Sequence, residues 1–518
     1  MPTADLVLTN AEVHTMTQPD ETASAVACRE GTVVFVGDDA TAEARIDQDT
    51  THIDCGGRVV LPGFVDAHTH LESTGKYLVH ADLAAATSRA EALASLREEA
   101  APDHDWHLGF GYDESAWPDG RYLRREDLDR VSTEEPVAAI RVDMHTASLN
   151  SVALERLGPE MPAADVRTED GEPTGVVVED AVDVLRSAIE PDLAETRALV
   201  ERARDRAHEL GVTAVHDMVR QSHAPRVYRD LAAEGVLELR VRLNYWSDHL
   251  EAVKELGLRT NAGGAFVQVG GIKSFTDGSI GARTAKLTEP YADGDADADS
   301  KGDETGNGQW VVTPEKLRDL VTEADEDGLQ LTIHAIGDAA IEEAVAALEA
   351  CPDPGGSRHR VEHVELATDD HLERMAAAGI VASCQPNFLQ WAGEGGLYDQ
   401  RLGEDRRRSS NRFRAMLDAG VPLAFGSDSM PMDPLLGLHH TVNAPDESQR
   451  LSVTEAIQAY TWGAAYAGFD EDRLGTLEEG TCADLVVLGA SPWAQPDAIR
   501  DIEVTTTVVD GEVVYDAG

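Results

Sequence analysis

Two histidines separated by a single residue are the first group in this chain that could do chemistry. His68 and His70 follow the apolar run at residues 59–66. Because side chains alternate between the two faces of a strand, histidines at this spacing leave the strand on the same side, where they can chelate one metal ion. A His-x-His pair alone is weak evidence, since surface histidines produce it by chance.

Three further candidate ligands come at the ends of later apolar runs. His334 ends the run 329–334, His363 ends the run 358–363, and Asp428 follows the last such run. Each alone has an ordinary interpretation, because a histidine at a strand end is often only hydrogen-bonded and Gly-Ser-Asp often caps a helix. Together they place ligands at the carboxyl ends of successive strands, which predicts a metal site at that end of a barrel.

The elements that must position these residues alternate between buried strands and amphipathic helices. We expect strands at 59–66, 106–111, 137–142, 213–217, 239–245, 267–276, 329–334, 358–363, 381–385 and 423–427. We expect helices between them at 89–100, 193–210, 314–327, 341–350, 369–378 and 453–467. This alternation predicts an α/β fold with a parallel sheet. The strands exceed the eight of a (β/α)8 TIM barrel, so we assign the excess to an inserted subdomain at about residues 72–187.

Short strands occur at both ends of the chain, including a hairpin signal at Asp510-Gly511. Neither set is large enough to bury a good core alone. We therefore expect residues 1–58 and 475–518 to combine into one small β-sandwich beside a barrel of residues 59–474. Two unrelated terminal hairpins are the alternative.

Composition limits the partners of this protein. The 518 residues include 96 acidic and 43 basic side chains, a formal net charge of −53. Such a field repels polyanions, so we expect a small-molecule substrate, no nucleic acid and no membrane surface. The start lacks the pattern of a signal peptide, and no run approaches the ~18 apolar residues of a membrane span, which favours a soluble cytoplasmic protein. A homodimer is the expected assembly.

The small number of lysines among the basic residues is also informative. Only six lysines occur, at Lys76, Lys254, Lys273, Lys286, Lys301 and Lys316. Widespread acidity with few lysines predicts a halophilic protein, since a Debye length of ~3 Å at ~1 M salt removes the self-repulsion. An ordinary acidic enzyme is the alternative. The five cysteines are widely spaced and odd in number, which predicts reduced buried thiols.

Several segments together resemble the amidohydrolase superfamily, and more narrowly its amidohydrolase 3 branch, the YtcJ-like metal-dependent hydrolases that include N-substituted formamide deformylases. The resemblance rests on five segments: the Pro-Gly-Phe-x-Asp-x-His-x-His opening at 62–70, residues 273–284, His334-x-x-Gly337-Asp338, Glu362-His363, and residues 426–428. It spans nearly the whole chain. The segments are specific for the family but not for a substrate.

The resemblance implies a centre of two divalent metal ions. His68 and His70 would bind the more buried ion with Asp428, while His334 and His363 would bind the second. Lys273 would carry a carbamate on Nζ and bridge the ions, because an unmodified ammonium repels cations whereas a carbamate can span the ~3.5–4 Å between them. Zinc is the expected metal, and manganese, iron or cobalt would fit the same donors. A salt-bridged lysine is the alternative for Lys273.

A catalytic assignment follows from this arrangement. Divalent ions bring the pKa of a bound water toward ~7. Asp428 would accept the proton from that water and deliver it to the leaving nitrogen. His145 or Arg283 would bind the substrate oxygen, although Arg283 has the alternative of pairing with a carboxylate such as Asp277. Asp277 and Asp338 are expected to orient the metal-binding side chains without contacting the metal themselves.

The predicted function is hydrolysis of an amide or formamide-type C–N bond. A mononuclear deaminase of a heterocycle is the first alternative, but such enzymes place a Glu three residues after the position of His334 and lack the bridging lysine. Gly337 occupies that place here. A non-catalytic homologue is the second alternative, and it is disfavoured because all six candidate ligands are present.

Overall fold

A computed structural model describes residues 2–98, 106–114, 117–142, 146–293 and 306–518. These residues form two compact units. The first comprises Met1–His70, Arg204–Gln221 and Pro225–Gly518, and the second comprises Leu71–Ala203 and Ser222–Ala224. Each unit is described by itself.

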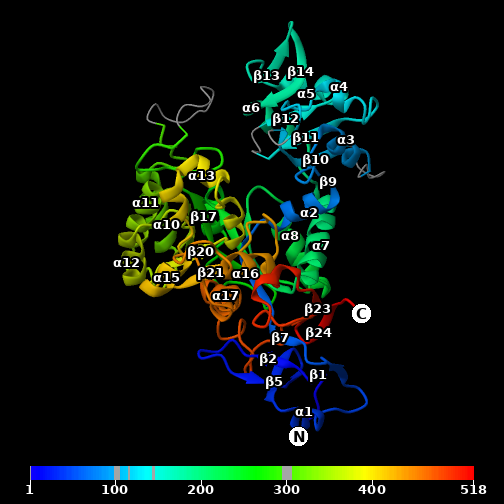
Figure 1. Ribbon diagram of the computed structural model, residues 1–518, viewed down its shortest axis with the longest axis vertical. Coiled ribbons are helices and arrows are strands. Elements are labelled where there is room, and N and C mark those ends of the chain that lie inside the picture. Colours follow the sequence, from blue (N-terminus) through cyan, green and yellow to red (C-terminus); the bar gives the residue numbers. More distant parts are fainter. Residues whose placement is uncertain (1, 99–105, 115–116, 143–145, 294–305) are drawn as a thin grey trace. The chain divides into compact units, whose positions relative to one another are not determined.

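Eight parallel strands form the barrel of the first unit (Figure 1). Their order is β8 (Phe64–Thr69), β15 (Val212–Val219), β16 (Arg240–Trp246), β17 (Val267–Phe275), β18 (Gln330–Ala335), β19 (Arg360–His363), β20 (Val381–Cys384) and β21 (Leu423–Phe425). The amides of Ser427 and Asp428 donate to the carbonyl of His68 at 3.1 and 2.7 Å, which joins the segment after the last strand to the first strand. The predicted (β/α)8 barrel is therefore confirmed.

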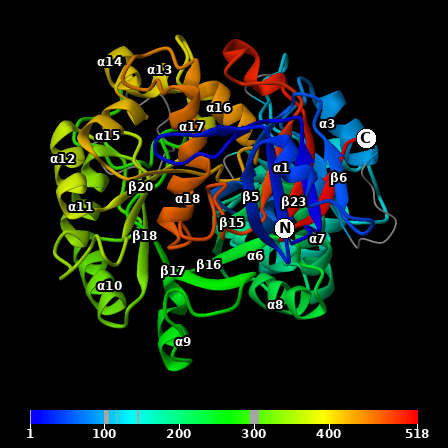
Figure 2. The ribbon, with the colours of Figure 1, turned by 90° about the horizontal axis from the view of Figure 1, so that it is seen from below.

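Helices pack outside these strands, as the view from below shows for α10 (Pro314–Glu326), α11 (Asp338–Leu348) and α12 (Asp369–Ala378) (Figure 2). Helix α12 begins where the Thr368 side chain accepts from the amide of His371, and it ends at Gly379, whose φ is 66°. The helix expected at 453–467 is instead two helices, α17 (Val453–Tyr460) and α18 (Trp462–Ala467). Thr461 separates them because its φ of −122° and ψ of −94° are not helical.

Strands from both chain ends form two further sheets. One has the order β5 (Thr32–Gly37), β4 (Ala25–Arg29), β1 (Leu6–Thr9) and β6 (Thr51–Asp54). The other has the order β24 (Glu512–Asp516), β23 (Val504–Val509), β22 (Leu485–Leu488), β7 (Val59–Pro62), β2 (Glu12–His14) and β3 (Thr22–Ala23). One buried cluster includes Leu8 and Val26 of the first sheet with Val60 and Val487 of the second. Residues from both ends of the chain thus share a core.

The single strand expected at 59–66 is in fact two strands in different sheets. β7 pairs with β2 and β22 among the terminal strands, whereas β8 opens the barrel. The chain crosses between them at Gly63, whose amide donates to the carbonyl of Asp484 at 2.9 Å. A Cβ on Gly63 would lie 2.3 Å from Oγ1 of Thr213, so only glycine allows this close crossing.

The second unit is built on a mixed sheet of β13 (Val166–Glu169), β14 (Glu172–Val178), β12 (Thr146–Leu149), β11 (Val137–Arg141), β10 (His107–Tyr112) and β9 (Ala81–Asp82). Its helices include α2 (Leu71–Val79), α3 (Arg89–Glu98), α5 (Ser151–Leu157) and α6 (Asp180–Ala188). Leu108, Ile140, Leu149 and Val177 belong to a core of its own. The unit runs on to Ala203, inside α7 (Leu193–Glu209), and so extends beyond the insert expected at 72–187.

Two general features concern the whole described chain. None of the helices in the described ranges is long and apolar enough to span a membrane. All five cysteines are free, and Cys482 is the one that is only half-buried. The predicted reduced thiols therefore agree with the structure.

Candidate metal centre

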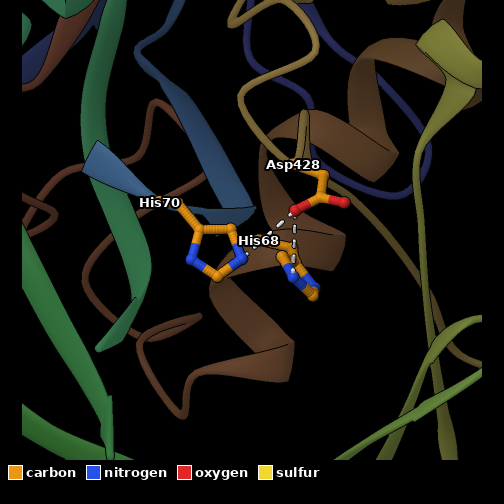
Figure 3. Close-up of side chains that lie close together, drawn as sticks. All are labelled: His68, His70 and Asp428. Carbon is orange, nitrogen blue, oxygen red and sulfur yellow. Dashed lines mark ion pairs between the residues drawn. The ribbon is translucent and has the colours of Figure 1, made fainter. Parts of the chain in front are cut away.

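Three candidate ligands converge at the carboxyl end of the barrel. His68 lies on β8, His70 follows it directly, and Asp428 lies in the loop after β21. Nε2 of His70 is 3.3 Å and Nε2 of His68 is 3.6 Å from Oδ1 of Asp428 (Figure 3). One ligand atom from each of the three residues lies within 4.8 Å of the other two. A single ion could therefore contact all three.

The hydrogen bonds of the two histidines fix which nitrogen can bind a metal. Nδ1 of His70 lies 3.0 Å from the carbonyl of Met218, and a carbonyl only accepts, so Nδ1 carries the proton. Nδ1 of His68 lies 2.5 Å from Oε2 of Glu362. Burial opposes ionisation of Glu362, but the Arg360 guanidinium holds its pKa below the ordinary value, so Glu362 is a carboxylate that accepts from His68. Both Nε2 lone pairs are therefore available beside Asp428.

The charge states also suit a cation. Burial lowers the pKa of His68 well below its ordinary value, with Lys273 adding to the effect, so the imidazole is neutral near pH 7. Burial opposes ionisation of Asp428, yet the polar contact with His70 and the neighbouring His68 and Lys273 lower its pKa to about 2. Neutral imidazoles and an ionised carboxylate are the forms in which these side chains bind metals.

The other three candidate ligands adjoin this group. The rings of His334 and His363 are 4.4 Å apart between centroids, and His363 is 5.0 Å from His68. Nε2 of His334 donates to the carbonyl of Gly278 at 3.0 Å, which leaves the lone pair on Nδ1. Nδ1 of His363 is buried without a hydrogen-bond partner among the described residues. An unpaired buried nitrogen of this kind fits a ligand atom.

Lys273 lies inside the same cluster. Its Nζ is 3.2 Å from Nε2 of His68, and the residue is only 1% exposed. Burial lowers the pKa of Lys273 to about 8, against the opposing effect of Glu362 and Asp428. The structure thus brings all six predicted ligands together.

The backbone is strained where two of these ligands sit. His363 and Val364 have φ values of 73° and 54°, and Asp428 and Ser429 have values of 54° and 60°. Residues with side chains rarely adopt this left-handed region, and each such residue costs about 1–3 kcal/mol. The surrounding contacts must impose these conformations, which turn the ligand side chains toward the centre.

The remaining predicted residues have varied surroundings. Asp277 accepts from the amides of Ile336, Gly337 and Lys286, and its Oδ1 lies 3.5 Å from Nε2 of His334. Asp338 instead accepts from the amide of Thr288 at 2.9 Å.

Arg283 donates from Nη2 to Oδ2 of Asp293 at 2.7 Å. Arg283 is thus paired with a carboxylate, but the partner is Asp293 and not Asp277, both of whose oxygens accept from backbone amides. His145 lies outside the described residues.

Sequence reasoning missed the residues that hold the ligands. Arg360 is fully buried and donates from Nε to Oε1 of Glu362 at 2.5 Å and from Nη2 to Oε2 at 3.0 Å. Asp66 accepts from the amide of His68 at 3.1 Å and from the amide and hydroxyl of Ser427 at 2.9 and 2.5 Å. Arg360 lies two residues before Glu362 on one buried strand, and Asp66 lies two residues before His68 on another. These charged residues at alternate positions of apolar strands were the signal that could have identified them.

Comparison with known proteins identifies the family of this chain. It belongs to the amidohydrolase family, whose model matches residues 51–515. It is 32% identical to the YtcJ protein of Bacillus subtilis (strain 168), over 97% of this chain and 98% of that protein. It is 26% identical to the N-substituted formamide deformylase of Arthrobacter pascens, over 99% of this chain and 98% of the relative. The predicted family is therefore confirmed.

A solved structure supports the same assignment. The crystal structure of an uncharacterized metal-dependent hydrolase from Pyrococcus furiosus is 30% identical to this chain and has a TM-score of 0.79. The match covers 94% of this chain and 99% of that one.

Proposed function

We propose that this protein is a metal-dependent hydrolase that cleaves a C–N bond of the amide or formamide type. One observation carries the proposal: the Nε2 lone pairs of His68 and His70 and the ionised Asp428 face one another at the barrel end where active sites of this fold occur. Membership of the amidohydrolase family and the names of the formamide deformylase and the metal-dependent hydrolase support it.

The donor set fits two divalent ions. His68, His70 and Asp428 would hold one, His334 and His363 would hold the other, and Lys273 would bridge them as a carbamate. The lowered pKa of Lys273 supports this role, since only the neutral amine reacts with CO2. Zinc suits these nitrogen and oxygen donors, as do manganese, iron and cobalt. When bound, such ions polarise a carbonyl and lower the pKa of water.

The chain's own residues supply proton transfer and positioning. Oδ1 of Asp428 faces the two histidines, so its second oxygen is the atom that would take a proton from water and return it to the leaving nitrogen. Glu362 holds the ring of His68 in one orientation. Aromatic rings flank the other histidines, with Phe275 4.4 Å from His334 and Phe388 5.9 Å from His363 between centroids. These rings would exclude water and contact an apolar substituent of the substrate.

The deaminase alternative is weakened by the surroundings of Gly337. A Cβ at this position would lie 1.9 Å from the carbonyl oxygen of Lys286. No side chain fits there, so the glutamate of that alternative has no place without a backbone rearrangement.

The test combines metal analysis with a substrate panel. His68→Ala should lose metal and hydrolysis of N-formyl, N-acyl and cyclic amides at high salt, while remaining folded. His52→Ala is the matched control, because His52 contacts Thr9 in a terminal sheet. Parental metal content and activity in His68→Ala would refute the site. Ammonia released from a heterocycle, with no amide cleaved, would favour the deaminase.

A further inference from the structure

The residues on either side of Asp428 join the loop after β21 to the end of β8. Before it, the amide and the hydroxyl of Ser427 donate to the carboxylate of Asp66 at 2.9 and 2.5 Å. After it, Oγ of Ser429 accepts from the amide of His70 at 3.0 Å and donates to the carbonyl of His70 at 3.1 Å. All of these residues belong to the first unit. Asp428 is therefore held from both sides.

Ser429 gives the backbone of His70 the contacts that a neighbouring strand gives to the residues before it. The ladder between β8 and β15 ends at Thr69, which pairs with Asp217, so His70 lies one residue beyond the ladder. The hydroxyl of Ser429 bonds to both the N–H and the C=O of His70, the two groups that a strand partner would satisfy. The backbone of His70 is thus held at the point from which its imidazole reaches Asp428.

These contacts use the full hydrogen-bonding capacity of the Ser429 hydroxyl. The carbonyl of His70 can only accept, so the hydroxyl proton of Ser429 is directed to it. The hydroxyl of Thr69, 3.0 Å from the same oxygen, is then the donor in its contact with Ser429. One donated and two accepted bonds occupy the one proton and the two lone pairs of a hydroxyl. Ser429 therefore contributes to the site through the backbone that it holds, and not as a metal ligand.

The backbone conformation at Ser429 makes the presence of a side chain there informative. Its φ is 60° and that of Asp428 is 54°, in the left-handed region that glycine adopts most readily. Asp428 needs its side chain as a candidate ligand. A serine at the next position carries a conformational cost that a glycine would avoid. The hydrogen bonds of its hydroxyl are the gain that accompanies this cost.

We propose that Ser429 is a positioning residue of the metal centre, whose hydroxyl fixes the separation between the imidazole of His70 and the carboxylate of Asp428. The inference rests on the proposed function, because it needs a metal ion held by both side chains. Nε2 of His70 and Oδ1 of Asp428 are 3.3 Å apart (Figure 3). Two ligands ~2.0–2.1 Å from a tetrahedral ion are separated by ~3.3 Å, so the two atoms already have the spacing that a metal requires.

Two substitutions separate the hydroxyl from the backbone conformation. Ser429→Gly and Ser429→Ala both remove the hydroxyl, but only glycine suits a φ of 60°. Both variants should keep the parental circular dichroism spectrum and bind metal about 10-fold more weakly in competition with a chelator. Ser409→Ala is the matched control, because the Ser409 hydroxyl donates to the carbonyl of Asp405 at the exposed end of α14 (Glu404–Arg408). Parental affinity in Ser429→Gly would overturn the proposal, since backbone conformation alone would then explain the site. If the alanine variant does not fold, the glycine variant decides.

Two further measurements do not depend on turnover. In crystals of the metal-free protein, Ser429→Gly should widen the separation between Nε2 of His70 and Oδ1 of Asp428 by about 0.5 Å or more. An unchanged separation would overturn the proposal. The visible absorption of the cobalt(II)-loaded protein reports the geometry of the ligands, and it should change in both Ser429 variants but not in Ser409→Ala.

These outcomes also distinguish the role of Ser429 from the proposed function. A parental protein that binds no divalent metal would refute the proposed function. A parent that binds metal, together with a glycine variant that binds it equally well, would refute the positioning role alone.

Discussion

Nδ1 of His68 lies 2.5 Å from Oε2 of Glu362, and these residues belong to β8 and β19, which are not neighbours in the barrel. Arg360 donates a hydrogen bond to the carboxylate of Glu362 and another to His216. A continuous polar chain therefore crosses the barrel interior and ends on His68, a candidate metal ligand. The orientation of its imidazole ring depends on charges buried between the strands.

Glu362→Gln should weaken the metal centre without unfolding the barrel. The amide offers His68 a weaker acceptor and leaves Arg360 without its ionic partner, so metal affinity should fall about 10–100-fold. Competition with a chelator measures this. Glu251→Gln, at a side chain that is 84% exposed, is the control and should bind metal as the parent does. Equal affinities in both variants would show that Glu362 does not orient the ligand.

Lys273→Ala should reduce the metal content from two ions to one and remove most of the activity, because the bridging anion is lost. A small carboxylic acid should restore part of both by filling the vacated space. Lys254→Ala, which removes a lysine paired with Glu323, is the control. Extra planar density on Nζ of Lys273 beside two metal peaks in a crystal structure would support the bridge. A bare lysine beside one fully occupied metal would reduce the centre to one ion.

Salt should stabilise the fold. With a net charge of −53, carboxylate repulsion is strong in dilute buffer and is screened in molar salt. The thermal midpoint should therefore rise between low and molar potassium chloride. A midpoint independent of salt concentration would contradict the halophilic assignment and leave the enzymatic one intact.

The buried thiols should resist alkylation in the native protein. Burial raises the pKa of Cys28 to about 12 and those of Cys55 and Cys351 to about 11. Because the thiolate is the reactive form and its fraction falls as the pKa rises, alkylation at pH 8 should be slow and should increase only above about pH 10. Mass spectrometry after iodoacetamide treatment measures this, with the urea-unfolded chain as control. Rapid native labelling of Cys28 at pH 8 would contradict the burial.

The sequence predicted the barrel strands well, because each is a short apolar run that ends at a turn or a polar residue. Alternation also placed His68, His70 and the later candidate ligands at the carboxyl ends of strands. The features that the sequence did not predict depend on contacts between residues that are far apart in the chain. The apolar run at 59–66 contains no local signal for its division, which depends on Thr213 and Asp484. The pairing of Arg283 with Asp293 likewise depends on the path of a loop.

The division of the first strand at Gly63 has a consequence for biosynthesis. β7 leads directly into the strand that carries His68, and it lies between β2, made early, and β22, which begins at Leu485. On the ribosome, β7 therefore exposes an unpaired edge until nearly all of the chain has emerged, and Asp428 also arrives late. We expect the nascent chain to need protection at this edge from aggregation, and metal to enter only after release.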